Sequence, residues 1–129
     1  MKHSIYNYSH AKGGLLNIGD HIQSLAAKQF LPSVDFYVDR DKPNLDYDKS
    51  KIIMNGWHTF GPQNYPPSKN LLPLLISYHL NPFYADKILS RKECRDFFIQ
   101  NGPVGCRDYT TLEIFKKYNI DAYYSFCLT

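Results

Sequence analysis

The segment Gly105-Cys106-Arg107-Asp108 carries the most informative combination of side chains in the chain. Arg107 can form paired hydrogen bonds with a carboxylate or a phosphate, and a helix is predicted to begin directly after it. The amides of a helix N-terminus favour anions in the same way. The segment therefore predicts an anion-binding turn, and its chemistry does not choose between carboxylate and phosphate. The alternative is a purely structural pair of Arg107 and Asp108.

A second candidate lies before the first predicted helix. Gly14 and Gly19 have the spacing of half a phosphate-binding P-loop, but that motif continues with Lys and then Ser or Thr. Asp20 and His21 stand there instead, and a carboxylate would repel a triphosphate, so a nucleotide-hydrolysing site is excluded. Asp20 remains a candidate general base with Asn17 and Gly19 beside it. The alternative is that Asn17 or Asp20 only caps the helix.

Two further candidates follow predicted strands. Gly56 would let the backbone approach a ligand closely, and Asn55 can both donate and accept hydrogen bonds. The alternative for this segment is a simple turn in which Trp57 packs. His79 ends another strand, where an imidazole can transfer protons or bind an anion. The alternative for His79 is a hydrogen-bonded or solvent-facing side chain without a functional role.

Composition excludes several other classes of protein. The three cysteines contain no C-x-x-C pair, which argues against a disulfide framework or a zinc site and predicts reduced thiols, with Cys106 buried rather than nucleophilic. The net charge is +3 and the basic residues are scattered, so we expect no nucleic-acid binding. No signal peptide is visible, and no stretch approaches the roughly 18 apolar residues of a membrane span. We therefore expect a cytoplasmic protein with no membrane span.

The elements that must position these residues alternate between helix and strand. Apolar spacing and capping boxes predict helices at 20–31, from Ser90 and from Thr110, and strands at 34–38, 52–54, 72–78, 104–106 and 122–127. This alternation predicts a largely parallel sheet covered on both faces, and 129 residues suit one domain. Ligands of such sheets bind beyond the carboxyl ends of the strands, where all four candidate segments are expected.

Five segments, in order, resemble the polysaccharide pyruvyl transferase family, and together they extend over most of the chain, from residue 17 to residue 111. They are NIGDHIQSLA (17–26), VDFYVDR (34–40), MNGW (54–57), SYH (77–79) and PVGCRDYTT (103–111). The resemblance implies an α/β, Rossmann-like three-layer domain with a mostly parallel sheet, similar to one half of a GT-B-type glycosyltransferase.

The same resemblance implies an activity in exopolysaccharide biosynthesis. A pyruvyl group would pass from phosphoenolpyruvate, the donor substrate, to two hydroxyls of a carbohydrate acceptor in a cell-surface polysaccharide, forming a ketal without a metal or other cofactor. The expected residues fall into a catalytic set, Asp20, His79 and Arg107, and a substrate-binding set, Asn17, Gly19, Asn55, Gly56 and Asp108.

The family also has a second half that is expected to supply much of the donor site. Residues 1–129 would then be the N-terminal half, inactive as an isolated fragment and completed by a second domain or by a homo-oligomer. Two other functions stay open. One is a non-catalytic carbohydrate-binding or assembly domain, which the eleven Tyr and eight Phe would serve. The other is a glycosyltransferase-like enzyme with a nucleotide-sugar donor.

Overall fold

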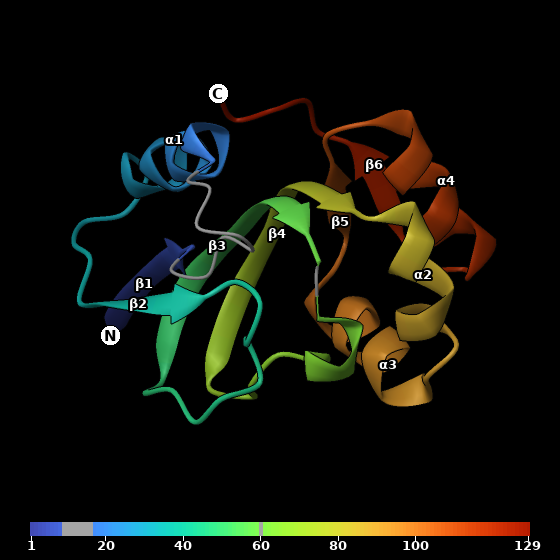
Figure 1. Ribbon diagram of the computed structural model, residues 1–129, viewed down its shortest axis with the longest axis horizontal. Coiled ribbons are helices and arrows are strands. Elements are labelled where there is room, and N and C mark those ends of the chain that lie inside the picture. The colour runs from blue at the N-terminus through green and yellow to red at the C-terminus, as the bar shows by residue number, and fades with distance from the viewer. Residues whose placement is uncertain (9–16, 60) are drawn as a thin grey trace.

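The structure, a computed structural model, describes residues 1–8, 17–59 and 61–129 (Figure 1). Its elements alternate along the chain as the sequence predicts. They are β1 (Lys2–Asn7), α1 (Ile18–Lys28), β2 (Phe36–Asp39), β3 (Ser50–His58), the 3-10 turn η2 (Pro62–Asn64), β4 (Leu71–Leu80), α2 (Pro82–Leu89), α3 (Lys92–Asn101), β5 (Val104–Cys106), α4 (Tyr109–Lys117) and β6 (Ala122–Tyr124).

The strands form one six-stranded sheet in the order β2-β1-β3-β4-β5-β6, and every neighbouring pair is parallel. The chain runs from β1 out to β2, returns past β1 to β3, and then adds strands toward the other edge. The direction of winding thus changes between β1 and β3, and ligands of open parallel sheets bind beside such a switch point. The predicted parallel α/β sheet is confirmed, and the architecture is consistent with a Rossmann-like fold.

Helices flank the sheet (Figure 1). Helix α1 lies against β1 and β3, α3 packs against β4, α4 packs against β4 and β5, and α2 packs against α3 and α4. Successive residues of β3 show the two environments, because side chains alternate along a strand. Met54 belongs to the buried aromatic core, whereas the amide of Asn55 reaches α1.

The core beneath α3 and α4 is built from aromatic rings. Tyr78, Phe98 and Phe115 are fully buried. Their ring centroids are 4.9–6.1 Å apart in tilted or edge-to-face arrangements, which is the geometry that aromatic pairs favour. Phe98 of α3 and Phe115 of α4 both point into this core. This core holds α4 against β4, and both elements carry candidate site residues.

Several local predictions are wrong, for physical reasons that the structure makes plain. Ser90 closes α2 rather than opening the next helix, whose N-cap is Arg91 without a side-chain cap. Asp108, not Thr110, caps α4 by accepting the amide of Thr111 at 2.8 Å. The strand β1 and helix α2 were not predicted, since β1 is a short polar segment and α2 begins at Pro82. Proline suits the first turn of a helix, because its missing N–H would have no partner there.

The predicted turn after Met54 is also wrong, because β3 continues through it to His58. The pairing register shifts here, because Met54 and Gly56 of β3 lie opposite Leu75 and Tyr78 of β4, which leaves one extra residue in β4 as a bulge. Gly56 has a φ of +86°, a left-handed conformation that glycine adopts without a steric penalty. Strand β3 thereby carries Trp57 to the carboxyl edge of the sheet.

Candidate functional site at the carboxyl edge of the sheet

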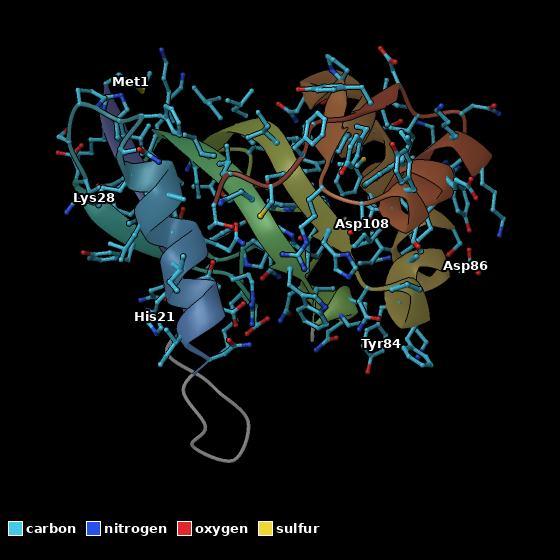
Figure 2. The ribbon with its side chains drawn as sticks, turned by 90° about the horizontal axis from the view of Figure 1, so that it is seen from above. Met1, His21, Lys28, Tyr84, Asp86 and Asp108 are labelled. Atoms are coloured by element: carbon cyan, nitrogen blue, oxygen red, sulfur yellow. The ribbon has the colours of Figure 1, made fainter. Side chains whose placement is uncertain are left out.

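The carboxyl ends of the central strands bring charged and aromatic side chains together. Arg40 follows β2, Trp57 is near the end of β3, and His79 is near the end of β4. Helices α1 and α4 both begin at this edge, so Asp20 in the first turn of α1 and Asp108 at the N-cap of α4 face it from two sides. Figure 2 shows β3 and β4 running between α1 and the start of α4, where Asp108 is labelled.

His79 and Asp108 form a short side-chain contact at this edge. The Nδ1 atom of His79 lies 2.6 Å from Oδ2 of Asp108. Burial alone would raise the pKa of the Asp108 carboxyl, but hydrogen bonds from the Thr111 amide and from His79 lower it. An ionised Asp108 accepts the Nδ1 proton of His79. The lone pair of Nε2 is then left to accept a proton from a substrate, as in a general base.

Arg107 flanks the same carboxylate. Its Nε atom lies 3.9 Å from Oδ2 of Asp108, and its backbone amide donates to the carbonyl of Tyr78 at 3.0 Å. The sequence predicted that helix amides would assist Arg107 in binding an anion. The carboxylate of Asp108 already accepts one of these amides, that of Thr111. The partly exposed guanidinium of Arg107 is therefore the group that can meet an incoming carboxylate or phosphate.

Asp20 lies in a second charged group around Arg40. The Arg40 guanidinium is 3.0 Å from Asp20 through Nη1 and 3.3 Å from Asp41 through Nε. It also covers the ring of Tyr8, with 4.6 Å between Cζ and the ring centroid. Only 4% of the Arg40 side chain is exposed. Two carboxylates already neutralise one guanidinium here, so this part of the edge does not fit an anion-binding site.

Sequence reasoning missed Arg40 as a site residue, although a signal for it exists. Arg40-Asp41 follows β2 just as Arg107-Asp108 follows β5, so the same dipeptide stands after two strands of the sheet. A third Arg-Asp pair, Arg95-Asp96, lies within α3, so comparing the two pairs that follow strands would have identified Arg40. Its burial between rings and carboxylates depends on residues distant in sequence, and the dipeptide alone does not predict it.

Trp57 joins the two groups. Its ring lies nearly parallel to that of His79, with 6.4 Å between centroids, and the Arg40 guanidinium lies 5.5 Å from the centroid of the same indole. The predicted catalytic residues Asp20, His79 and Arg107 thus lie along one continuous edge, connected through Arg40, Trp57 and Asp108. That these three side chains line one anion-binding hollow stays a prediction.

The predicted substrate-binding residues near α1 have structural contacts. Asn17 caps α1 by accepting the amide of Gly19 at 2.9 Å, which was the alternative interpretation of that segment. The buried amide of Asn55 donates to the carbonyl of Gln23 at 2.9 Å and so ties α1 to β3. A Cβ atom at Gly56 would contact Gln23 at 3.4 Å. These residues set the position of α1, and Gly14 of the P-loop-like spacing lies outside the described residues.

A buried histidine lies below this edge. His58 stacks on Tyr78 with ring centroids 4.0 Å apart, and its Nε2 atom is 3.1 Å from the hydroxyl of Tyr6. Burial, assisted by the positive charge of Arg40, lowers the pKa of His58 well below its usual value. The ring is therefore neutral at physiological pH. It was not predicted, since nothing in the sequence distinguishes a core histidine at a strand end from a reactive one.

The structure and the comparisons limit other assignments. Within the described residues, no group of three or more His, Cys, Asp or Glu side chains is arranged to hold a metal ion. None of the helices described here combines the length and apolar character needed to cross a membrane. Cys106 is buried and its pKa is raised to about 12, mainly by burial, which agrees with its predicted inert role.

No family model, curated protein or solved structure matches the chain.

Proposed function

We propose that the carboxyl edge is the acid–base site of a pyruvyl transferase that uses phosphoenolpyruvate and a sugar of a cell-surface polysaccharide. The observation that carries this proposal is the pair of His79 and Asp108 beside Arg107. It places a potential base next to a guanidinium that can meet an anionic donor. The resemblance of the segments at 17–26, 54–57, 77–79 and 103–111 supports the same activity, and these segments meet at this edge.

The proposed reaction has a simple proton balance. Two hydroxyl oxygens of the sugar form bonds to C2 of phosphoenolpyruvate, while the bond from C2 to the phosphate oxygen breaks. The methylene carbon C3 gains one hydroxyl proton and becomes a methyl group. The second hydroxyl proton leaves with inorganic phosphate. A site for this reaction needs a group that removes a proton from a hydroxyl and a cation that meets the donor.

The side chains of the edge can supply these roles. His79 would take a hydroxyl proton at Nε2, because Asp108 holds its Nδ1 proton. Arg107 would pair with the carboxylate or the phosphate of the donor. Asp20, which is paired with Arg40, would be a second proton acceptor beside His79. Asn17, Gly19, Asn55 and Gly56 would act through the placement of α1 rather than through direct proton transfer.

The proposal departs from the expectation of an inactive fragment, because it assigns both the base and the donor-binding guanidinium to residues 1–129. It is therefore tested on this chain with phosphoenolpyruvate and a panel of oligosaccharides. Binding of the donor is followed by phosphorus NMR, and transfer is read from phosphate release and from the mass of the acceptor. We expect donor binding to be lost in Arg107→Gln and kept in His79→Gln, while transfer falls by about a hundredfold or more in His79→Gln. Failure of the wild-type chain to bind phosphoenolpyruvate contradicts the proposal. Binding of a nucleotide sugar instead would favour a glycosyltransferase-like enzyme.

A further inference from the structure

Three aromatic residues form an exposed group next to the candidate site, and we name Tyr109, Tyr124 and Phe126 the aromatic platform. Tyr109 stacks on Tyr124 with centroids 4.5 Å apart and an interplanar angle of 18°. Tyr124 contacts Phe126 with centroids also 4.5 Å apart. Tyr109 is 65% exposed and Phe126 66% exposed, so the outer rings present free surface to solvent. Exposed apolar groups of this kind mark binding surfaces.

The aromatic platform adjoins the His79 and Asp108 pair. Tyr109 is the first residue of α4 and directly follows Asp108, the N-cap. Tyr124 pairs with Cys106 in the register between β5 and β6, and Cys106 directly precedes Arg107. The platform therefore continues the candidate site toward β6. A ligand on these rings would have Arg107 and Asp108 at its border.

The backbone holds the platform in an unusual conformation. Phe126 has a φ of +63°, a left-handed conformation that is strained for a bulky side chain. The neighbouring Ser125 fixes it, because its amide donates to the carbonyl of Cys106 at 2.8 Å and its hydroxyl accepts the amide of Ser77 at 2.9 Å. Ser77 itself has a φ of +53°. Strained residues that neighbouring bonds hold in place tend to gather at functional sites.

We propose that the aromatic platform binds a pyranose ring of the carbohydrate acceptor, an inference that rests on the proposed function for the role of that sugar. The C–H face of a pyranose is flat and apolar and can pack on an aromatic ring, while its hydroxyls project at the rim. Tyr109 and Tyr124 combine a ring with a hydroxyl that can bond such a rim. Arg107 and Asp108 add charged partners for the hydroxyls at the border with His79.

The surroundings favour a sugar over the other ligands that stack on rings. Proteins that stack nucleobases add a positively charged groove for the phosphate backbone. The residues of the chain around the platform, 104–110 and 122–129, contain Arg107 as their one cation and also the acidic Asp108. A neutral ring with many hydroxyls fits this balance better than a polyanion does.

The experiment measures binding of neutral oligosaccharides to the 129-residue chain by calorimetry. We expect Tyr109→Ala and Phe126→Ala each to weaken binding by about tenfold or more. Matched controls are Tyr37→Ala on β2, where the residue is 58% exposed, and Phe30→Ala after α1, where the residue is 63% exposed. Both controls remove an exposed ring of the same type away from the site and should leave affinity unchanged. Circular dichroism of all four variants checks that they fold.

Other outcomes overturn the inference. Wild-type chain that binds no oligosaccharide, or binds it equally well after Tyr109→Ala, removes the platform as the sugar site. Oligonucleotides that displace the oligosaccharide would instead make the platform a site for stacked nucleobases. Self-association that Tyr109→Ala abolishes, without sugar binding, would make the platform an interface between copies.

The inference and the proposed function can fail separately. Sugar binding that depends on the platform, without any pyruvylated product or donor binding, would leave the inference standing and refute the pyruvyl transferase. Pyruvyl transfer with the same KM for the acceptor in wild type and in Tyr109→Ala would support the pyruvyl transferase and refute the platform as the acceptor site. His79→Gln serves as the dividing variant, because it should keep sugar affinity and lose transfer.

Discussion

The carboxylate of Asp108 contacts Nδ1 of His79 at 2.6 Å through Oδ2, and through Oδ1 it accepts the amide of Thr111 at 2.8 Å. One side chain therefore starts α4 and orients the imidazole at the end of β4. The two residues are 29 positions apart in the sequence, and the parallel sheet brings them together. Because the same carboxylate caps α4 and contacts the imidazole, suitable substitutions can separate the two roles.

Asp108→Asn and Asp108→Ala should differ in stability but not in their effect on His79. Asparagine caps helices about as well as aspartate, so Asp108→Asn should remain nearly as stable as wild type, whereas Asp108→Ala should lose about 1 kcal/mol of unfolding free energy. Both changes remove the charge that holds the Nδ1 proton. Urea denaturation measures the stability, and nitrogen NMR of His79 identifies its tautomer. An unchanged Nδ1–H tautomer in Asp108→Asn would show that Asp108 does not orient the ring.

Arg40→Met should be strongly destabilising, because Asp20 and Asp41 would remain without their shared guanidinium. We expect a loss of about 3 kcal/mol, as for other buried pairs broken at one partner. Adding Asp20→Asn should restore part of that loss, since coupled residues are not additive. The control is Lys49→Met, which removes an exposed cation. Equal unfolding free energies for Arg40→Met and this control would contradict the buried network.

The buried His58 should make stability depend on pH below neutrality. Its pKa is lowered in the folded state, so the unfolded chain binds a proton that the folded chain does not. Stability is then full above the unfolded pKa of about 6.5 and falls by about 1.4 kcal/mol per pH unit beneath it. Urea denaturation over this range should give a smaller slope for His58→Gln than for wild type. The exposed His21→Gln is the control, and parallel slopes for all three proteins would refute the role of His58.

Cys127 should be the most reactive thiol in the native chain. Burial opposes ionisation, but hydrogen bonds from Thr129 and Gln23 outweigh it and lower the pKa of Cys127 to about 7. Cys94 and Cys106 are buried, and their pKa values are raised. Iodoacetamide labelling followed by peptide mass spectrometry should modify Cys127 first, with a rate that rises as pH increases through 7. Thr129→Ala should move that rise to higher pH. Native labelling of Cys106 at a similar rate would contradict the described burial.

Much of the fold follows from patterns that are local in sequence. The apolar run around Ile52 and Met54 predicts a buried strand, and the glycine and proline at 102–103 mark the step from α3 to β5. The candidate residues Asp20, His79 and Arg107 could be placed at one edge because parallel strands end on the same side. The apolar periodicity and the parallel topology were sufficient to predict that these residues share one edge of the sheet.

The contacts of the site depend on tertiary structure that periodicity does not describe. Nothing local to Arg40 predicts that two carboxylates and the ring of Tyr8 enclose it. Trp57 was expected in a turn, and its contact with His79 arises because β3 continues past a bulge. Helix caps were also misassigned, since several polar residues compete at a helix start and backbone geometry decides between them.

The most direct test of the central claim is an NMR titration of the chain with phosphoenolpyruvate and then with oligosaccharide. The account predicts that the donor shifts the side-chain resonances of Arg107, His79 and Trp57 together with one dissociation constant, and that the sugar adds shifts at Tyr109. Shifts confined to the hollow at the amino ends of β3 and β4, lined by Phe30, Leu72 and Leu74, would contradict it. So would an absence of shifts with either ligand.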